Sequence, residues 1–377
     1  MKNINNIFIS AGETSGDMLG ANLARALLQK SPAIKLAGMG GKKMQDAGVS
    51  VIFDSEKLAV VGFVEIFIHL FSIIKMWRAI KKYFRTAKPD LVILIDLPDT
   101  HFRFLKTLKQ LNIPVLYYVS PQIWAWRAWR IKAIQKYVNH MAVLFSFEEK
   151  IYQNANVPVT FVGHPLGDIV KPTMTKNAAY DFFQLDENRP VVTLFPGSRR
   201  SELKNHLFII IDAVKKIAAE KPETQFTLML ADHFDAEKIR SQLPSEIKII
   251  QKNMYDLLQI TDAAIAVSGT VTLEIALMQV PLCIIYKMKP LSFWIAKKLI
   301  RVNNIGLCNI IAEKTVAREF IQDDVKPIRI ADEIIKLLDN KNYHDRIQFE
   351  LAKIKNKVSV ENKNSSEIVA DIALRLI

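Results

Sequence analysis

The strongest constraint on the fold is a repeated pattern in which a short apolar run ends in a turn and a helical segment follows. Val191–Phe195 is the clearest case, because Pro196-Gly197 ends the run and an amphipathic pattern then extends over about 200–220. A continuous apolar run of this length is typical of a strand buried on both faces of a sheet. We therefore expect a strand, a tight turn and a helix, with Ser198 as the helix cap.

The same pattern recurs in both halves of the chain. Further strands are expected at 4–10, 34–37, 91–95, 114–119, 140–144, 159–162, 226–230, 247–250, 263–267 and 281–286. Helical segments separate these strands. Such alternation predicts an α/β fold with parallel sheets that helices cover on both faces.

The chain is expected to form two domains. Turn residues at Gly163–Gly167, followed by Lys171-Pro172, divide the pattern into two series, and 377 residues exceed one ordinary core. We expect doubly wound, Rossmann-like domains at 1–165 and 166–345, facing an interdomain crevice, and a helical tail at 346–377 packing across them. Ligands of such folds bind at the loops that follow the carboxyl ends of the strands.

Composition narrows the partners and the compartment. A net charge of +13 favours phosphorylated ligands, an anionic membrane surface or nucleic acid. Aromatics and arginines are not interleaved in an RNA-binding pattern, so nucleic acid is the weakest of the three and is not expected as a partner. Cys283 and Cys308 lie in apolar runs, which favours a reduced, cytoplasmic protein, and residues 1–11 are too short an apolar run for a signal peptide. The spacing of Cys and His predicts no metal, and we expect no cofactor.

Two turns of the second half have the form of phosphate-binding loops. Each follows an apolar strand and opens a helix, so backbone N–H groups and the positive end of a helix dipole favour an anion there. The expected ligands are Gly197, Ser198, Arg199, Ser268, Gly269 and Thr270. The guanidinium of Arg199 suits diphosphate oxygens, and Glu274 could accept hydrogen bonds from ribose hydroxyls. The alternatives are an ordinary turn with a solvated arginine, and an acid that the helix dipole favours.

The first half offers carboxylates at strand ends. Residues 10–17 lack the G-x-G-x-x-G spacing of a dehydrogenase, but Glu13, Ser15 and Asp17 offer polar groups for hydroxyls. The alternative is a turn with helix-capping acids. Asp96 follows the apolar run Leu91–Ile95, so desolvation is expected to raise its pKa toward that of a general base. It could equally be only a turn residue, and Asp99 is expected to cap a helix that begins near residue 100.

A cluster of tryptophans follows the strand expected at 114–119. Trp124, Trp126 and Trp129 lie beside Arg127 and Arg130. The indole rings could stack on a sugar or line an acyl channel, with the arginines binding a phosphate. The alternative is that the rings are core anchors for the next helix.

Residues 63–84 are too apolar for a helix with one buried face. Glu65, His69 and Lys75 interrupt them, so a transmembrane span is not expected. Aromatic residues that run into Lys81, Lys82 and Arg85 suit a helix that dips into an anionic membrane interface. A fully buried helix is the alternative.

These motifs together resemble the bacterial lipid-A-disaccharide synthase family, over nearly the whole chain. The stretches that carry the resemblance are Ala11–Asp17, Gly40-Gly41 with Met44, Gly62 with Val64-Glu65, Ile95–Asp99, Tyr118–Pro121 with Trp124–Arg127, Gly163-His164, Pro196–Arg199, Ser268–Thr270 with Leu273-Glu274, Tyr286–Pro290 and Phe293-Trp294. The chain departs from the family pattern at Lys42, Lys287 and Cys308, where a proline, an arginine and a proline are usual.

The resemblance implies an inverting GT-B glycosyltransferase of lipid A biosynthesis. Such enzymes transfer a 2,3-diacylglucosamine unit from UDP-2,3-diacylglucosamine to 2,3-diacylglucosamine 1-phosphate and release UDP. They work without a metal, peripherally, on the cytoplasmic face of the inner membrane. By the same resemblance, Asp96 is the base and Arg199 is required for activity. The residues assigned to the UDP pocket are Ser268, Gly269, Thr270, Glu274, Asn309 and Gln322.

Two other functions stay open at this point. One is a UDP-sugar enzyme that acts on a soluble sugar, such as a UDP-N-acetylglucosamine 2-epimerase. The other is a non-catalytic protein that binds lipid or nucleotide. The apolar segment 63–84 argues against the first, and the presence of both Asp96 and Arg199 argues against the second.

Overall fold

The computed structural model describes residues 5–54, 66–290, 293–294, 302–360 and 364–377, with backbone only at 66–72. The chain divides into two compact units. The first contains Met1–Pro165 and Ser359–Ile377, and the second contains Leu166–Val358. The chain thus leaves the first unit after Pro165 and returns to it at its C-terminal end.

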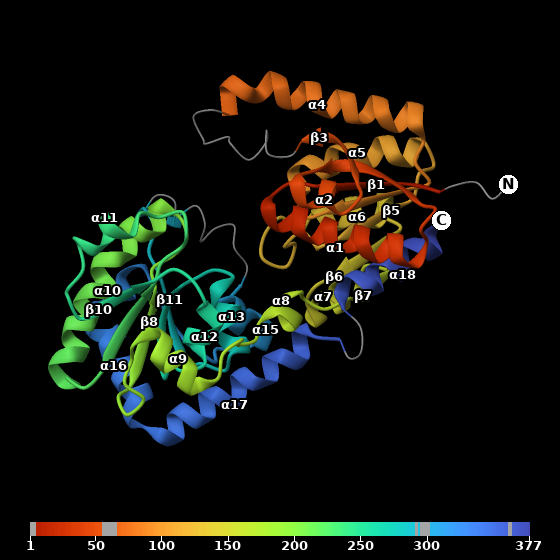
Figure 1. Cartoon of the computed structure of the whole chain (residues 1–377). Coiled ribbons are helices and arrows are strands. Elements are labelled where there is room, and N and C mark those ends of the chain that lie inside the picture. The colour runs from red at the N-terminus through yellow and green to blue at the C-terminus, as the bar shows by residue number, and fades with distance from the viewer. Residues whose placement is uncertain (1–4, 55–65, 291–292, 295–301, 361–363) are drawn as a thin grey trace. The chain divides into compact units, whose positions relative to one another are not determined.

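The first unit is built on a seven-stranded sheet, ordered β3-β2-β1-β4-β5-β6-β7 (Figure 1). All neighbouring strands are parallel. The strands are β1 (Asn6–Ala11), β2 (Lys35–Gly40), β3 (Ser50–Asp54), β4 (Leu91–Ile95), β5 (Val115–Tyr118), β6 (His140–Val143) and β7 (Val159–Phe161). Successive strands are added to one side of β1 as far as β3 and to its other side from β4 onward. The strand order therefore reverses between β1 and β4, and doubly wound folds bind ligands at such a point.

Most helices of the first unit form two groups. The unit's helices are α1 (Thr14–Lys30), α2 (Lys42–Asp46), α4 (Ile66–Ala87), α5 (Pro98–Gln110), α6 (Arg130–Tyr137), α7 (Ser146–Asn154) and α18 (Ser365–Leu376). One group contains α1, α2 and α18, and the other contains α4, α5 and α6, whereas α7 contacts β6 and β7. The C-terminal α18 packs against α1, and Lys30 Nζ lies 2.7 Å from Asp371 Oδ1.

The second unit repeats the design around a six-stranded parallel sheet, ordered β10-β9-β8-β11-β12-β13. Its strands are β8 (Val191–Phe195), β9 (Gln225–Met229), β10 (Ile247–Ile250), β11 (Ala263–Val267), β12 (Leu282–Tyr286) and β13 (Arg318–Ile321). Here the strand order reverses between β8 and β11. Both central strands are buried along their whole length, as their unbroken apolar sequences predict.

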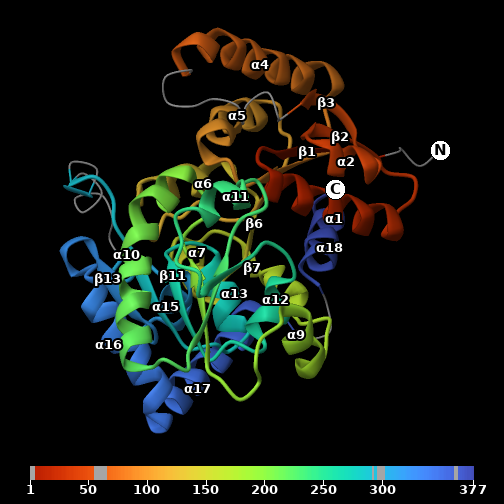
Figure 2. The same ribbon diagram turned by 60° about the vertical axis from the view of Figure 1, so that its left-hand side comes forward.

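Several helices of the second unit also pack in two groups, each in contact with β11. The unit's helices are α8 (Leu166–Ile169), α9 (Lys176–Phe183), α10 (Arg200–Glu220), α11 (Ala236–Arg240), α12 (Met254–Leu258), α13 (Val271–Leu277), α15 (Leu307–Ala312), the 3-10 helix η1 (Gln322–Asp324), α16 (Pro327–Asp339) and α17 (Lys341–Val358). Figure 2 shows α10 beside α16, whereas α13, α15 and α17 contact one another.

The predicted α/β architecture with parallel sheets is confirmed, but sequence patterns missed two strands. Ser50–Asp54 alternates between half-buried and exposed residues, and Arg318–Ile321 begins with two charged residues. Both are edge strands, so they lack the continuous apolar run that marks the central strands.

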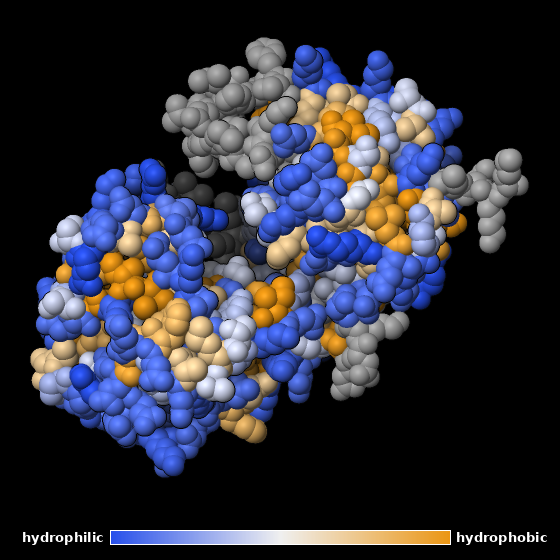
Figure 3. Space-filling view, in the orientation of Figure 1, coloured by the Kyte–Doolittle hydropathy of each residue, from blue (hydrophilic) through white to orange (hydrophobic). Residues whose placement is uncertain are grey.

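The second half of α4 is a core helix. Ile80 and Phe84 are fully buried, and the Phe84 ring packs edge-on against Phe8 and Phe104. The first residues of the predicted membrane-dipping segment, 63–65, lie outside the described residues, as does Gly62. Within the described part of the chain, no helix is both long and apolar enough to cross a membrane. On the face shown in Figure 3, hydrophobic side chains form a patch in the area where Figure 1 draws α10.

Candidate active site

A pocket of the second unit lies at the carboxyl ends of β8 and β11, where the strand order reverses. Its volume is about 980 Å³, which is in the range of small-molecule sites. The predicted residues that line it are Gly197, Ser198, Arg199, Ser268, Gly269, Thr270 and Glu274. The fold therefore brings together both turns that the sequence singled out, although they are some 70 residues apart.

The turn after β8 differs from the prediction in its details. Ser198 does not cap α10, because the N-cap residue is Arg199 and the carboxylate of Glu202 accepts hydrogen bonds from Ser198 N (3.0 Å) and Arg199 N (3.1 Å). These two N–H groups are thus not free. Gly197 has φ +103, and a Cβ there would lie 2.5 Å from the Glu202 side chain, so the turn requires glycine.

Arg199 contributes the exposed positive charge of this turn. Its side chain is 80% exposed, and its guanidinium lies 3.7 Å from Glu202 Oε1. Because both residues line the pocket, a diphosphate bound at this turn would meet the Arg199 guanidinium and the Glu202 carboxylate together. An anion can gain the turn's N–H groups only by displacing Glu202.

The turn after β11 holds a hydrogen-bonded acid. Tyr255 donates its hydroxyl hydrogen to Glu274 Oε1 at 2.8 Å, and burial raises the pKa of Glu274. The hydroxyl of Ser268 donates to the carbonyl of Ile305 at 2.8 Å, whereas no atom comes within 4 Å of a Cβ built on Gly269. The turn backbone is therefore open to a ligand. Sequence reasoning missed Tyr255, whose only signal was a position near a strand end.

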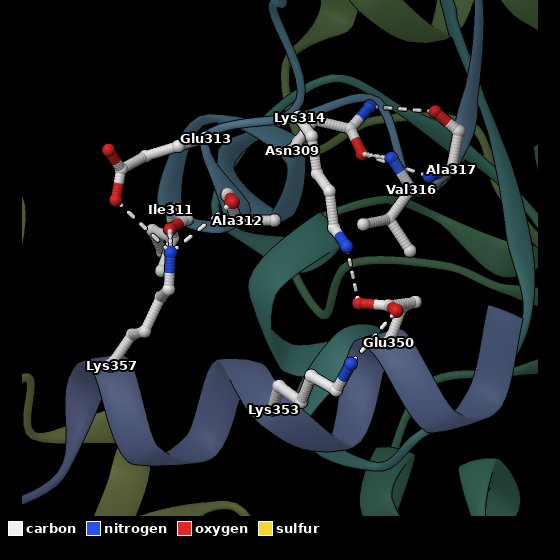
Figure 4. Close-up of polar contacts among 10 residues, drawn as sticks. All are labelled: Asn309, Ile311, Ala312, Glu313, Lys314, Val316, Ala317, Glu350, Lys353 and Lys357. Carbon is white, nitrogen blue, oxygen red and sulfur yellow. Dashed lines mark hydrogen bonds and ion pairs between the residues drawn. The ribbon is translucent and has the colours of Figure 1, made fainter.

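Asn309 and Gln322 do not line this pocket. Asn309 is fully buried. Its Oδ1 accepts hydrogen bonds from the N–H groups of Val316 and Ala317, and its Nδ2 donates to the Ala317 carbonyl (Figure 4). Gln322 Oε1 accepts from Met288 N, and its Nε2 donates to Met288 O. Both side chains hold the loops that surround β12 and β13.

Helix α17 fastens the same region from outside. Lys357 Nζ donates to the carbonyls of Ile311 and Ala312, and Glu350 pairs with both Lys314 and Lys353 (Figure 4). These contacts bond the end of α15 and the loop after it to a long helix.

The first unit places Asp96 at its own reversal point, directly after β4. Asp96 and Leu97 both have positive φ, 51 and 44, which is strained for residues other than glycine. Burial raises the pKa of the Asp96 carboxyl, and the charge of Glu13 raises it further. The predicted shift of this acid toward a general base is thus supported by its surroundings.

Two buried side chains, His101 and Tyr117, bond the Asp96 backbone, and a third, Ser10, bonds His101. Sequence reasoning missed all three. The Asp96 carbonyl accepts hydrogen bonds from His101 Nδ1 (2.7 Å) and from the Tyr117 hydroxyl (2.9 Å). Burial lowers the pKa of His101 to about 4, so the ring is neutral and carries one hydrogen. Because a carbonyl cannot donate, this hydrogen is on Nδ1, and Nε2 accepts from the Ser10 hydroxyl at 2.9 Å.

The turn after β1 completes this site. A Cβ on Gly12 would lie 2.5 Å from the Leu97 side chain, so glycine permits the two turns to meet. Glu13 and Ser15 are exposed at the start of α1, and Glu13 makes no side-chain cap. Asp17 is instead structural: it accepts hydrogen bonds from the N–H groups of Gly41, Lys43 and Met44.

Asp99 was expected to cap α5, but it does not. The helix begins at Pro98 with Leu97 as the N-cap, and Asp99 Oδ1 instead pairs with the guanidiniums of Arg127 and Arg130. The sharp turn at Asp96 starts the helix earlier than the sequence indicated. Asp99 therefore partly neutralises the arginines that were expected to bind phosphate.

The tryptophans have distinct environments. Trp124 Nε1 donates to Glu148 Oε1 at 3.1 Å, and burial raises the pKa of Glu148 to about 7. The Arg127 guanidinium lies over the Trp126 ring, 4.2 Å from its centroid. Trp124 and Trp126 are half-buried, and Arg127 is exposed. Trp124 is thus anchored, whereas Arg127 remains accessible.

Neither unit contains a metal-type cluster among its described residues, since no three His, Cys, Asp or Glu side chains come together there. Cys283 and Cys308 are both buried and unbridged. Burial raises the pKa of the Cys308 thiol to about 12, so it is not a nucleophile.

Comparison with known proteins identifies close relatives. Residues 7–373 match the family described as Lipid-A-disaccharide synthetase. The lipid-A-disaccharide synthase of Coxiella burnetii (strain Dugway 5J108-111) is 49% identical over 371 residues, 98% of each chain. That of Geobacter sulfurreducens is 44% identical over 374 residues, 98% of this chain and 97% of the relative.

Solved structures share the fold at low identity. A putative UDP-N-acetylglucosamine 2-epimerase from Listeria monocytogenes has a TM-score of 0.63 at 13% identity, covering 98% of this chain and 95% of its own. The UDP-GlcNAc 2-epimerase from Neisseria meningitidis, bound to UDP-GlcNAc, has a TM-score of 0.63 at 14% identity, covering 98% and 100%. At this identity the likeness concerns the fold alone.

Proposed function

The chain belongs to the lipid-A-disaccharide synthase family and is a glycosyltransferase of lipid A biosynthesis, and we propose that it joins two diacylated glucosamines. The donor is UDP-2,3-diacylglucosamine and the acceptor is 2,3-diacylglucosamine 1-phosphate. The acceptor's 6-hydroxyl attacks the anomeric carbon of the donor, the bond to UDP breaks, and the configuration inverts.

The observation that carries this proposal is the environment of Asp96. Its carboxyl has a raised pKa, and hydrogen bonds from His101 and Tyr117 fix its backbone. A base with a pKa near the working pH takes the hydroxyl proton most effectively, which contributes a factor of roughly 100 to 10,000. Asp96 thus accepts the proton that the acceptor loses as the new glycosidic bond forms.

The pocket of the second unit suits the donor nucleotide. The Glu274 carboxylate, which Tyr255 orients, can accept hydrogen bonds from ribose hydroxyls. The exposed guanidinium of Arg199 stabilises the charge that develops on the leaving diphosphate. Gly197 and the open turn 268–270 offer backbone contacts, and the Ser198 N–H does so once the diphosphate displaces Glu202. In this proposal Asn309 and Gln322 support the pocket walls from behind.

The first unit is proposed to bind the acceptor and the membrane, and residues 166–345 the UDP-sugar. Glu13, Ser15, Trp124, Trp126 and Arg127 follow strands of the first unit and offer the acceptor polar and aromatic groups. Exposed Arg78, Lys82 and Arg85 on α4 suit an anionic bilayer surface. The protein would thus act at the cytoplasmic face of the inner membrane.

UDP release by the purified protein in detergent tests the proposal. With UDP-2,3-diacylglucosamine as donor, we expect release that depends on 2,3-diacylglucosamine 1-phosphate and a disaccharide product identified by mass spectrometry. Release without acceptor, or turnover of UDP-N-acetylglucosamine alone, would overturn it.

A further inference from the structure

A second cavity of the second unit, of about 490 Å³, lies between α10 and α11. Its floor consists of Leu203 and Leu207 from α10 and Ile239 from α11, all nearly buried. Its walls are Phe234 and Phe208, and the Phe208 side chain is 60% exposed. Residues 203, 207 and 208 share one face of α10 because of the helical period. We call this cavity the α10–α11 groove.

The rim of the groove is basic. Arg200 and Lys204 extend from α10, and Lys238 extends from α11. The groove's one carboxylate, Asp235, caps α11 through Lys238 N and lies 3.2 Å from Lys238 Nζ. The rim therefore carries three cationic side chains and one carboxylate, and that carboxylate is already bonded to Lys238. An apolar floor under a cationic rim complements a lipid chain attached to an anionic head.

The groove adjoins the proposed nucleotide pocket. Arg199 and Glu202 line the pocket, whereas Arg200 and Leu203, each one residue further, line the groove. The segment after β9 divides in the same way: residues 231–232 border the pocket, and 233–235 border the groove. One helical turn and one short segment thus separate the two cavities.

We propose that the α10–α11 groove is an acyl-chain subsite for the sugar-nucleotide donor. This inference rests on the proposed function. The donor's acyl groups are attached at C2 and C3 of glucosamine, and C2 is bonded to the anomeric carbon that carries the diphosphate. The acyl group at C2 is therefore only a few bonds from the diphosphate, and Arg200 and Lys204 of the groove's rim follow Arg199 on the same helix. A bilayer lipid lacks this link to the pocket.

The subsite has a measurable signature in donor binding. Each methylene buried on the floor should strengthen donor binding about fourfold. Wild-type protein should accordingly bind UDP-2,3-diacylglucosamine far more tightly than UDP-N-acetylglucosamine, whereas UDP itself does not reach the groove. Because the chain contacts persist through the reaction, they should act on KM rather than on kcat.

Phe208→Ala removes a wall with little risk to folding, since the side chain is mostly exposed. We expect KM for UDP-2,3-diacylglucosamine to rise about three- to tenfold, with unchanged kcat and unchanged UDP affinity by calorimetry. Gln242→Trp, at an exposed lining position, should raise KM by filling the groove. The matched control is Phe349→Ala on α17, which removes a 63% exposed phenylalanine outside the groove.

The outcomes separate this inference from the proposed function. If wild-type protein neither binds nor uses the diacylated donor, the proposed function itself fails. If wild-type protein is active but both groove variants keep the wild-type KM, only the subsite is overturned. Sedimentation with vesicles of phosphatidylcholine and phosphatidylglycerol forms the second arm. Loss of vesicle binding in both variants, with unchanged KM in detergent, would assign the groove to bilayer lipid and overturn the donor assignment.

Discussion

The two units reverse their strand order in the same way, but they build the turns at that point differently. In the first unit the carbonyl of Asp96 accepts two hydrogen bonds from buried side chains, and two consecutive residues are held at positive φ. In the second unit Arg199 is 80% exposed, and the nearby N–H groups are bonded to the protein's own Glu202.

This difference matches the two proposed tasks. A base must be placed accurately before the substrate arrives, and a rigid, strained turn achieves this at a cost in stability. A nucleotide site can instead be completed by its ligand. The negative charge of the diphosphate would compete with the Glu202 carboxylate for the turn's N–H groups and for the Arg199 guanidinium. The comparison predicts that substitutions in the first site impair removal of the proton from the acceptor hydroxyl, whereas substitutions in the second impair stabilisation of the charge on the leaving UDP.

Asp96→Asn should have the largest effect. The amide cannot accept the hydroxyl proton, so kcat should fall by roughly 100- to 10,000-fold, while UDP affinity should stay unchanged because the proposed UDP pocket is lined by residues of the other unit. Turnover assays and calorimetry measure the two quantities. Full activity in this variant would remove Asp96 from the mechanism.

Arg199→Ala should come next, with kcat lower by on the order of 100- to 1,000-fold, because one charged donor to the developing negative charge is lost. Lys216→Ala is the control, since it removes another exposed cation from the same helix, α10. A similar loss in both variants would point to net charge rather than to a contact with the diphosphate.

His101→Ala should reduce kcat about 10- to 100-fold, because the Asp96 backbone loses a donor and its carboxyl is no longer held in place. His101→Asn retains a side-chain N–H and should recover part of the loss. UDP affinity should not change in either variant, and thermal unfolding should verify that both fold. Equal kcat in the alanine and asparagine variants would contradict a positioning role for the hydrogen bond.

Local sequence predicted the parts of this comparison that depend on strand ends. Asp96 and Arg199 each follow an unbroken apolar run, and the fold itself directs such residues to the same edge of a sheet. The remainder depends on tertiary contacts between distant residues. Ser10 and His101 are separated by 91 positions. Nothing in the local sequence around Asn309 indicates that its amide bonds the backbone of Val316 and Ala317.

Glu13→Gln should have the smallest effect, a shift in the pH profile. Asp96 works as a base only when ionised, so kcat/KM should fall as the pH drops through its pKa. The negative charge of Glu13 disfavours ionisation of Asp96 and contributes to its raised pKa. Removal of that charge should therefore move the acidic limb of the profile to lower pH, whereas Asp46→Asn on α2, where the acid is paired with Lys42, should leave it in place. An acidic limb that stays fixed or moves upward in Glu13→Gln would show that the two carboxylates do not interact, and burial alone would then account for the raised pKa of Asp96.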